Sequence, residues 1–102
     1  MPIREFSGDI CRMKQSVQLK ITGIVQGVFF RQTTVEKARE LDICGWIRNC
    51  EDGSVELEAE GDENLLKVFI QWCHRGPRSA VVNNVEIKNG EAKNYKTFEI
   101  KR

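Results

Sequence analysis

An arginine follows a glycine-containing stretch at residues 23–31, GIVQGVFFR, and this combination suits an oxyanion site. Glycine lets a chain turn with several backbone N–H groups directed into one concavity, which binds anions. Arg31 would add a planar charged group that can contact two oxygens of a phosphate or carboxylate. The spacing matches neither GxxxxGK[ST] nor GxGxxG, so no nucleotide motif is present. On these residues alone, a plain turn with a solvated arginine is an equally good interpretation.

Such a loop needs a strand before it and a helix after it. Residues 16–23 alternate apolar and polar side chains, which predicts a half-buried strand. A helix is expected over residues 33–41, with Thr33 or Thr34 as its N-cap and Glu36 completing a capping box with Thr33. The positive end of the helix dipole would then lie beside the loop and add to its donors.

The remaining elements follow from the same patterns. A second helix is expected between an Asp62 N-cap and a stop at Gly76. By strict alternation, Glu56, Glu58 and Glu60 should face solvent. Further strands are expected over residues 43–50, 54–60, 81–88 and 97–101, of which the first two form a hairpin.

The element order βαββαβ, followed by a short final strand, predicts a ferredoxin-like α+β sandwich. We expect an antiparallel sheet of four or five strands, with both helices on one face. In this topology strands 16–23 and 43–50 run in the same direction, with strand 54–60 between them. Asn49 would therefore lie at the end of the sheet from which the anion loop leaves. Two strand spacings, about 10 Å, would separate it from the end of strand 16–23.

Length and charge limit the possible functions. A chain of 102 residues suits one domain. We expect residues 16–102 to form it and residues 1–15 to be a poorly ordered N-terminal extension. Sixteen basic and fifteen acidic residues give a net charge of +1, which argues against recruitment to nucleic acid or a membrane. No apolar segment is long enough for a signal peptide or a membrane span, so we expect a cytoplasmic protein. We also expect it to be a monomer.

Cysteine and histidine offer little for metal or nucleophilic chemistry. Cys44 and Cys50 lie at opposite ends of one expected strand, too far apart for a disulfide, so both are expected as thiols. No CxxC motif occurs, and His74 follows Cys73 on a helix, where successive side chains point about 100° apart. We therefore expect neither a metal site nor a Cys/His nucleophile.

Three segments together resemble one known family. VQGVFFR at residues 25–31, GWIRNCEDGSVE at residues 45–56 and GPRSA at residues 76–80 resemble the acylphosphatase family, and the resemblance extends from about Val17 to the C-terminus. It implies an enzyme that hydrolyses the carboxyl–phosphate bond of an acyl phosphate to a carboxylate and inorganic phosphate. The resemblance also implies that no metal or organic cofactor takes part.

The resemblance assigns roles to particular residues. Arg31 would bind the phosphate, and Asn49 would orient the attacking water. The backbone N–H groups of the loop would complete a cradle formed by Gln26, Gly27, Val28, Phe29 and Phe30. A carboxylate leaves without a protein acid because the pKa of its conjugate acid is near ~4. Positioned donors are then sufficient, and the phosphate itself would accept the proton of the water.

The alternative is a non-catalytic module on the same fold that binds an oxyanion or carbamoyl phosphate. An RNA-recognition version is disfavoured, because outward-facing Glu56 and Glu58 on central strands would repel phosphates. Arg48 is expected to point away from Asn49 and to be solvated. Trp46 and Trp72 are expected in the core or at its edge.

Overall fold

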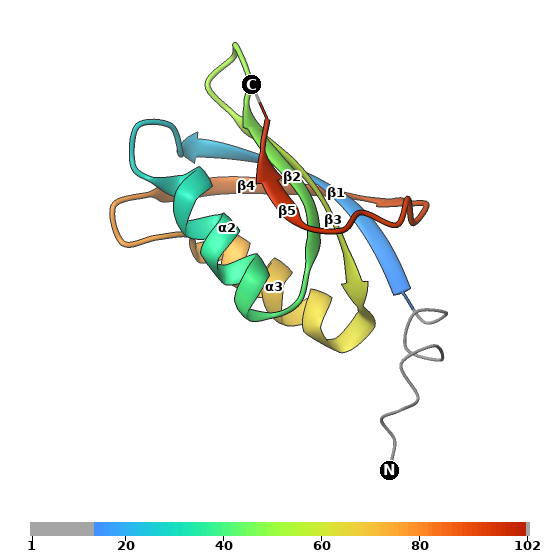
Figure 1. The fold of residues 1–102 in the computed structure, drawn as a ribbon. Helices are drawn as coiled ribbons and strands as arrows, with labels where there is room; N and C mark the ends of the chain where they lie inside the picture. Colours follow the sequence, from blue (N-terminus) through green and yellow to red (C-terminus); the bar gives the residue numbers. More distant parts are fainter. Residues whose placement is uncertain (1–13, 102) are drawn as a thin grey trace.

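A computed structural model describes residues 14–101, which form a five-stranded sheet with two helices packed against one of its faces (Figure 1). The helices are Phe30–Glu40 (α2) and Glu63–Arg75 (α3). The predicted ferredoxin-like α+β sandwich is confirmed, whereas most of the predicted extension at residues 1–15 lies outside the described residues. The strands in chain order are Lys14–Ile24 (β1), Cys44–Asn49 (β2), Val55–Asp62 (β3), Val81–Gly90 (β4) and Phe98–Ile100 (β5).

The order of strands across the sheet is β4-β1-β3-β2-β5. Both β1 and β2 pair antiparallel with β3, so they run in the same direction with β3 between them, as predicted. The loop after β1 and the last residue of β2, Asn49, therefore lie at the same end of the sheet, where these two strands terminate. Helix α2 packs against β2 and β5, and α3 packs against β1, β3 and β4.

The last strand makes the sheet mixed, whereas the sequence predicted a wholly antiparallel one. β5 pairs parallel with β2, from Gly45 opposite Phe98 to Ile47 opposite Ile100. The reason lies in where β4 ends. Because β4 is antiparallel to β1, the connecting segment 91–97 starts at the sheet edge where β1 and β2 begin, and the strand that follows it must run in the direction of β2.

Helix α3 has the predicted limits. The carboxylate of Asp62 accepts hydrogen bonds from the backbone N–H groups of Asn64 and Leu65, at 3.0 and 3.2 Å, and so caps the helix. Gly76 ends it with a φ of 71°. The buried face of α3 packs into a core made of residues from both helices and from the strands, among them Leu19, Ile21, Phe30, Ala38, Ile47, Leu57, Leu66, Phe69, Cys73 and Phe98.

Helix α2 begins at Phe30, three residues earlier than predicted, and the predicted capping box is absent. Its N-cap is Phe29, which has a left-handed backbone with φ 62° and makes no side-chain capping bond. The hydroxyls of Thr33 and Thr34 instead donate to the carbonyls of Phe29 and Phe30, at 2.9 and 2.7 Å. Arg31 consequently lies inside the first turn of the helix.

Two of the three glutamates expected to face solvent are buried. Glu58 and Glu60 are each 1% exposed, although they lie on the sheet face opposite the helices. Segment 91–97 crosses that face and covers them. The backbone N–H groups of Lys93 and Tyr95 donate to the Glu60 carboxylate, both at 2.7 Å. The alternation of side chains was therefore right, but it could not reveal what covers the second face.

Candidate active site

The loop between β1 and α2 is anchored by two buried side chains, Val25 and Phe30, each 1% exposed. Between them Gly27 has a φ of 75°, a left-handed conformation that glycine adopts without strain. Ser79, in the segment between α3 and β4, also fixes the loop. Its hydroxyl donates a hydrogen bond to the carbonyl of Val28 at 2.9 Å. Between the two anchors, Gly27 and Phe29 are exposed, whereas Gln26 and Val28 are half-buried and Val28 packs against the core.

Gly23 was expected to help the anion loop to turn, but it has a different structural role. It lies inside β1, where the pairing with β4 shifts register between Thr22 and Gly23. A Cβ atom at Gly23 would lie 2.1 Å from the carbonyl oxygen of Val81, so only glycine allows this approach. Gly27 is therefore the glycine of the loop, and Gly23 serves the sheet.

The N-terminus of α2 faces the same loop. The first backbone N–H of the helix to find a helical partner is that of Thr33, which donates to the carbonyl of Phe29 at 3.0 Å. The N–H groups of Phe30, Arg31 and Gln32 precede it and have no acceptor inside the helix. With no capping side chain, these donors and the positive end of the helix dipole remain available to an anion.

Arg31 and Asn49 line one pocket of about 270 Å³ between the loop, the start of α2 and the end of β2. Arg31 is half-buried and Asn49 is exposed. Within residues 14–101, neither side chain forms a hydrogen bond or an ion pair with another residue, so the guanidinium and the amide are both available to a ligand. The pocket is lined by Val25, Gly27, Phe29, Phe30, Arg31, Gln32, Asn49 and Ile100.

Not every predicted cradle residue reaches this pocket. Gly27, Phe29 and Phe30 line it, whereas Gln26 and Val28 do not. Ile100 contributes to the wall from β5, a contact that the sequence did not suggest. It could be anticipated only by knowing that the last strand lies beside β2.

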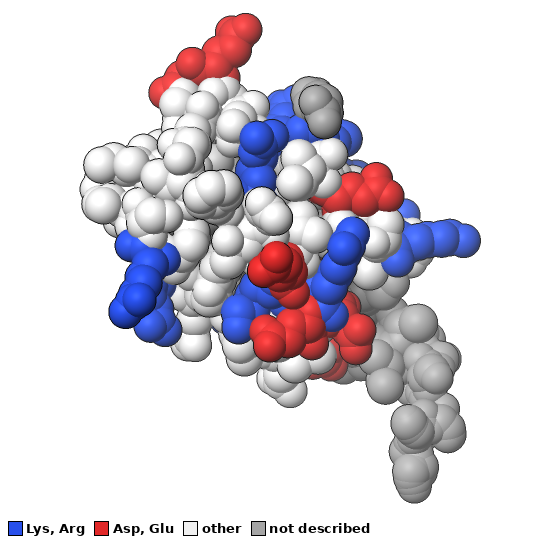
Figure 2. All heavy atoms as spheres, turned by 60° about the vertical axis from the view of Figure 1, so that its left-hand side comes forward, with Lys and Arg blue, Asp and Glu red and all other residues white. Residues whose placement is uncertain are grey.

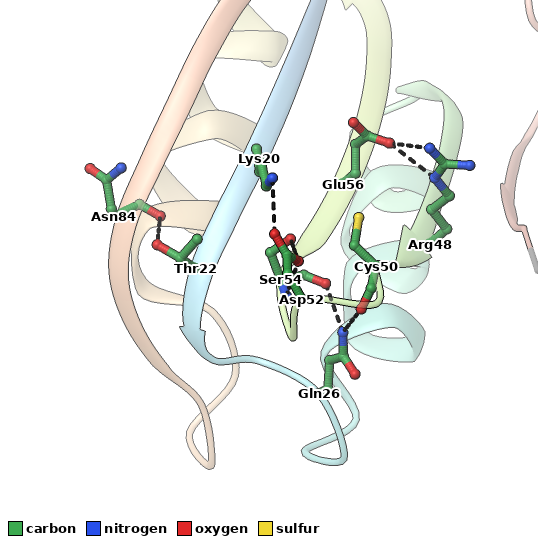
Figure 3. A network of polar contacts seen from close by, with 9 residues as sticks. All are labelled: Lys20, Thr22, Gln26, Arg48, Cys50, Asp52, Ser54, Glu56 and Asn84. Carbon is green, nitrogen blue, oxygen red and sulfur yellow. Dashed lines mark hydrogen bonds and ion pairs between the residues drawn. The ribbon is translucent and has the colours of Figure 1, made fainter.

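The side chain of Gln26 points toward the hairpin between β2 and β3 (Figure 3). Its amide nitrogen donates to the carbonyls of Cys50 and Ser54, both at 2.8 Å. No sequence pattern indicates that a glutamine in a loop will make such a contact. Only the backbone N–H of Gln26 was therefore expected to contribute to the site. The anion loop is thereby connected directly to the turn that follows Asn49.

Arg48 is exposed, as expected, but it is also ion-paired. Its Nε and one terminal nitrogen donate to a carboxylate oxygen of Glu56, at 2.9 and 2.6 Å (Figure 3). The guanidinium lies 5.5 Å from the ring centroid of Trp46. Because this charge is already paired on the hairpin, Arg31 is the better candidate for anion binding.

Figure 2 shows one face of the molecule, on which positive and negative side chains lie interspersed around a broad uncharged area. Residues 14–101 contain no group of three or more His, Cys, Asp or Glu side chains placed to hold a metal ion. Neither of the two helices in this range is long and apolar enough to cross a membrane. Cys50 is a thiol, as predicted. Cys73 is also a thiol, and burial raises its pKa far above its usual range.

The chain is similar to known proteins in both sequence and fold. A sequence model of the acylphosphatase family matches residues 17–100. An acylphosphatase of Trichormus variabilis is 43% identical over 86 residues, which are 84% of this chain and 85% of that protein. The structure of an acylphosphatase from Coxiella burnetii superposes with a TM-score of 0.85 at 33% identity, over 88% of this chain and 95% of that chain.

A further match is to part of a larger protein. Full-length HypF, solved in a phosphate- and nucleotide-bound form, superposes with a TM-score of 0.78 at 29% identity, over 87% of this chain but only 12% of its own. The acylphosphatases, by contrast, match along most of their length, and the family match includes both Arg31 and Asn49. This chain belongs to the acylphosphatase family.

Proposed function

We propose that the pocket between Arg31 and Asn49 is the site at which this acylphosphatase binds and hydrolyses its substrate. The observation that carries the proposal is the meeting of three unpaired groups around one pocket: the Arg31 guanidinium, the N–H groups at the start of α2 and the Asn49 amide. The first two suit an anion, and the third suits a water beside it. The site would hold a small acyl phosphate by its phosphoryl group and release inorganic phosphate.

In the proposed mechanism, Arg31 and the backbone N–H groups donate hydrogen bonds to the non-bridging oxygens of the phosphoryl group. Positive charge placed there stabilises the transition state, because charge spreads over those oxygens as the phosphoryl group is transferred. The helix dipole acts in the same direction. None of these groups has to gain or lose a proton.

Asn49 would orient the nucleophile. Its side-chain oxygen accepts a hydrogen bond from a water, and its nitrogen donates to a phosphate oxygen, which fixes the water in line with the bond to be broken. The water oxygen bonds to phosphorus, and the phosphorus–oxygen bond to the acyl group breaks. The acyl carboxylate leaves with the electron pair, and the proton of the water passes to a phosphate oxygen. A carboxylate is a good enough leaving group that neither a metal nor a protein acid is required.

A binding module that holds an oxyanion or carbamoyl phosphate without hydrolysis is the second candidate. The likeness to a segment of HypF, which was solved in a phosphate-bound form, is the observation in its favour. The likeness to acylphosphatases along most of their own length favours hydrolysis. We also propose that the protein acts as a cytoplasmic monomer. A net charge of +1 and the interspersed charges on the face shown in Figure 2 support the proposal that it does not bind nucleic acid.

Hydrolysis of benzoyl phosphate in the presence of a chelator tests the proposal. The parent protein should release benzoate and phosphate, and variants of Arg31 and Asn49 should lose turnover. Undiminished turnover in both variants would move the site elsewhere. Absence of hydrolysis by the parent, together with saturable phosphate binding, would favour the binding module.

A further inference from the structure

We propose that the side chain of Gln26 is a positioning residue, which fixes the separation between the phosphate cradle and Asn49. This inference rests on the proposed function of the pocket. Gln26 does not line the pocket, so it acts through its neighbours. It immediately precedes Gly27, which lines the pocket, and its side chain binds Cys50, which immediately follows Asn49.

Both donors of one amide group are used in this contact. The Gln26 nitrogen lies 2.8 Å from the Cys50 carbonyl oxygen and 2.8 Å from the Ser54 carbonyl oxygen (Figure 3). A side-chain amide nitrogen carries two hydrogens, so two acceptors at this distance satisfy it fully. Gln26 is half-buried, so both hydrogen bonds are partly shielded from water. We call these two bonds the Gln26 clasp.

The clasp holds a turn that is already closed. The N–H of Cys50 donates to the Ser54 carbonyl at 2.8 Å, and the N–H of Gly53 donates to the Cys50 carbonyl at 3.2 Å. The backbone N–H and hydroxyl of Ser54 both donate to Asp52, at 3.0 and 2.6 Å. The hairpin turn therefore moves as one body, and Asn49 at its base moves with it.

The topology explains why such a clasp is needed. The loop extends from β1, Asn49 ends β2, and β3 lies between these strands. No backbone ladder therefore joins β1 to β2 directly among the described residues. Gln26 spans this gap at the point where β3 begins, just after Ser54. A displacement of about 1 Å between catalytic groups can reduce a rate about 100-fold, so the clasp bears directly on turnover.

The substitution Gln26→Met tests the clasp with little risk to folding. Methionine has nearly the length of glutamine but donates no hydrogen bond. The two carbonyls keep their donors from Gly53 and Cys50, so no acceptor is left without a partner. Gln71→Met, on an exposed position of α3, is the matched control and should leave both activity and stability unchanged.

The clasp predicts a loss of turnover with retained phosphate binding. In Gln26→Met, kcat for benzoyl phosphate should fall about 10- to 100-fold. The inhibition constant of inorganic phosphate should change by less than about 3-fold, because Arg31 and the helix N–H groups remain in place. Parent-like kcat would overturn the proposal, as would a phosphate affinity that falls as much as kcat does.

A double-mutant cycle separates positioning from a general effect on the fold. If Gln26 acts by placing Asn49, then Gln26→Met should lower kcat by less than about 2-fold in a protein that already carries Asn49→Ala. A loss as large as that in the parent background would show that Gln26 acts independently of Asn49, and the positioning role would be wrong.

Hydrogen exchange keeps this inference separate from the proposed function. In Gln26→Met, backbone amides at residues 25–29 and 50–54 should exchange faster together, while those of α3 keep their parent rates. This result is expected whether or not the parent hydrolyses benzoyl phosphate. Unchanged exchange in either segment would overturn the clasp, whereas an inactive parent with coupled exchange would overturn only the proposed function.

Discussion

Arg31 and Asn49 approach one pocket from the ends of different elements, the first turn of α2 and the last residue of β2. Neither side chain is bonded to any other residue within the described range 14–101. A half-buried arginine without a carboxylate partner attracts an anion strongly, because water screens its charge only in part. The relationship between these two residues leads to separate predictions for binding and for turnover.

Substitution of Arg31 should impair both phosphate binding and hydrolysis. We expect Arg31→Ala to lower kcat/KM for benzoyl phosphate by about 1,000-fold or more, because it removes charge from the transferred group. Arg31→Lys should recover only part of this loss, since lysine keeps the charge but not the planar fork. Arg75→Ala, on the last turn of α3, is the control and should behave as the parent does. A parent-like inhibition constant for phosphate in Arg31→Ala would contradict the assignment.

Substitution of Asn49 should separate turnover from binding. Asn49→Ala should lower kcat about 100- to 1,000-fold, because the attacking water is no longer held in line. Phosphate should still inhibit this variant with nearly the parent constant. Asn49→Asp has the same size but places a negative charge beside the phosphate, so its phosphate affinity should fall as well. Steady-state kinetics with phosphate as inhibitor distinguish the two variants, and Asn84→Ala on β4 serves as control.

Gly45 should be among the positions least tolerant of substitution. It has a φ of 146°, and a Cβ atom there would lie 1.8 Å from the carbonyl oxygen of Glu58 on β3. Gly45→Ala should lower the free energy of unfolding by more than about 3 kcal/mol, because β2 and β3 must separate. Gly53→Ala is the matched control, since φ is 91° there but an added Cβ would have no atom within 4 Å apart from those of the adjoining residues. It should lose only about 1–2 kcal/mol. Urea unfolding of both variants gives the comparison.

Glu58 should make the stability depend on pH in the acid range. Burial alone would raise the pKa of Glu58, but hydrogen bonds from Lys93, Tyr95 and Gln18 outweigh burial and lower it from 4.5 to about 2. A lowered pKa means that the unfolded chain takes up the proton first. The stabilisation is therefore fully present above pH 4.5 and is lost as the pH falls toward 2.

The size of this effect can be measured by urea unfolding at pH 5 and pH 2.5. Glu58 should contribute on the order of 2–3 kcal/mol of the loss between these values, which Glu58→Gln should abolish. Glu56→Gln is the control, since Glu56 is only half-buried in its pair with Arg48. An acid dependence that is identical in the parent and in Glu58→Gln would show that other carboxylates are responsible.

The fold and the meeting of Arg31 with Asn49 could be predicted because both depend on periodicity and strand order. Alternating side chains located the strands, and the βαββαβ order brought the ends of β1 and β2 to one edge. The start of α2 was predicted wrongly, because the pattern Thr33-x-x-Glu36 resembles a capping box. No local rule indicates that a phenylalanine in a left-handed conformation would end the loop instead.

The contacts made across the sheet could not be predicted. Glu58 and Glu60 look solvent-facing by alternation, and only the path of segment 91–97 buries them. The bonds from Gln26 to Cys50 and Ser54 join positions that are distant in sequence, and one sequence contains no trace of such a contact. The register of the sheet must be known before either contact becomes visible.

The last strand also shortens the exposed edge of the sheet beside the proposed active site. β5 is three residues long, but it pairs with Gly45, Trp46 and Ile47 along the outer side of β2. The N–H of Lys101 extends this cover by donating to the Ile47 carbonyl at 2.8 Å. Without β5, the strand that ends in Asn49 would present a row of unpaired backbone groups, which is a template for pairing between molecules. β5 is itself the edge strand, but its three residues offer other chains a shorter template than the six residues of β2 would, which limits aggregation beside the proposed active site.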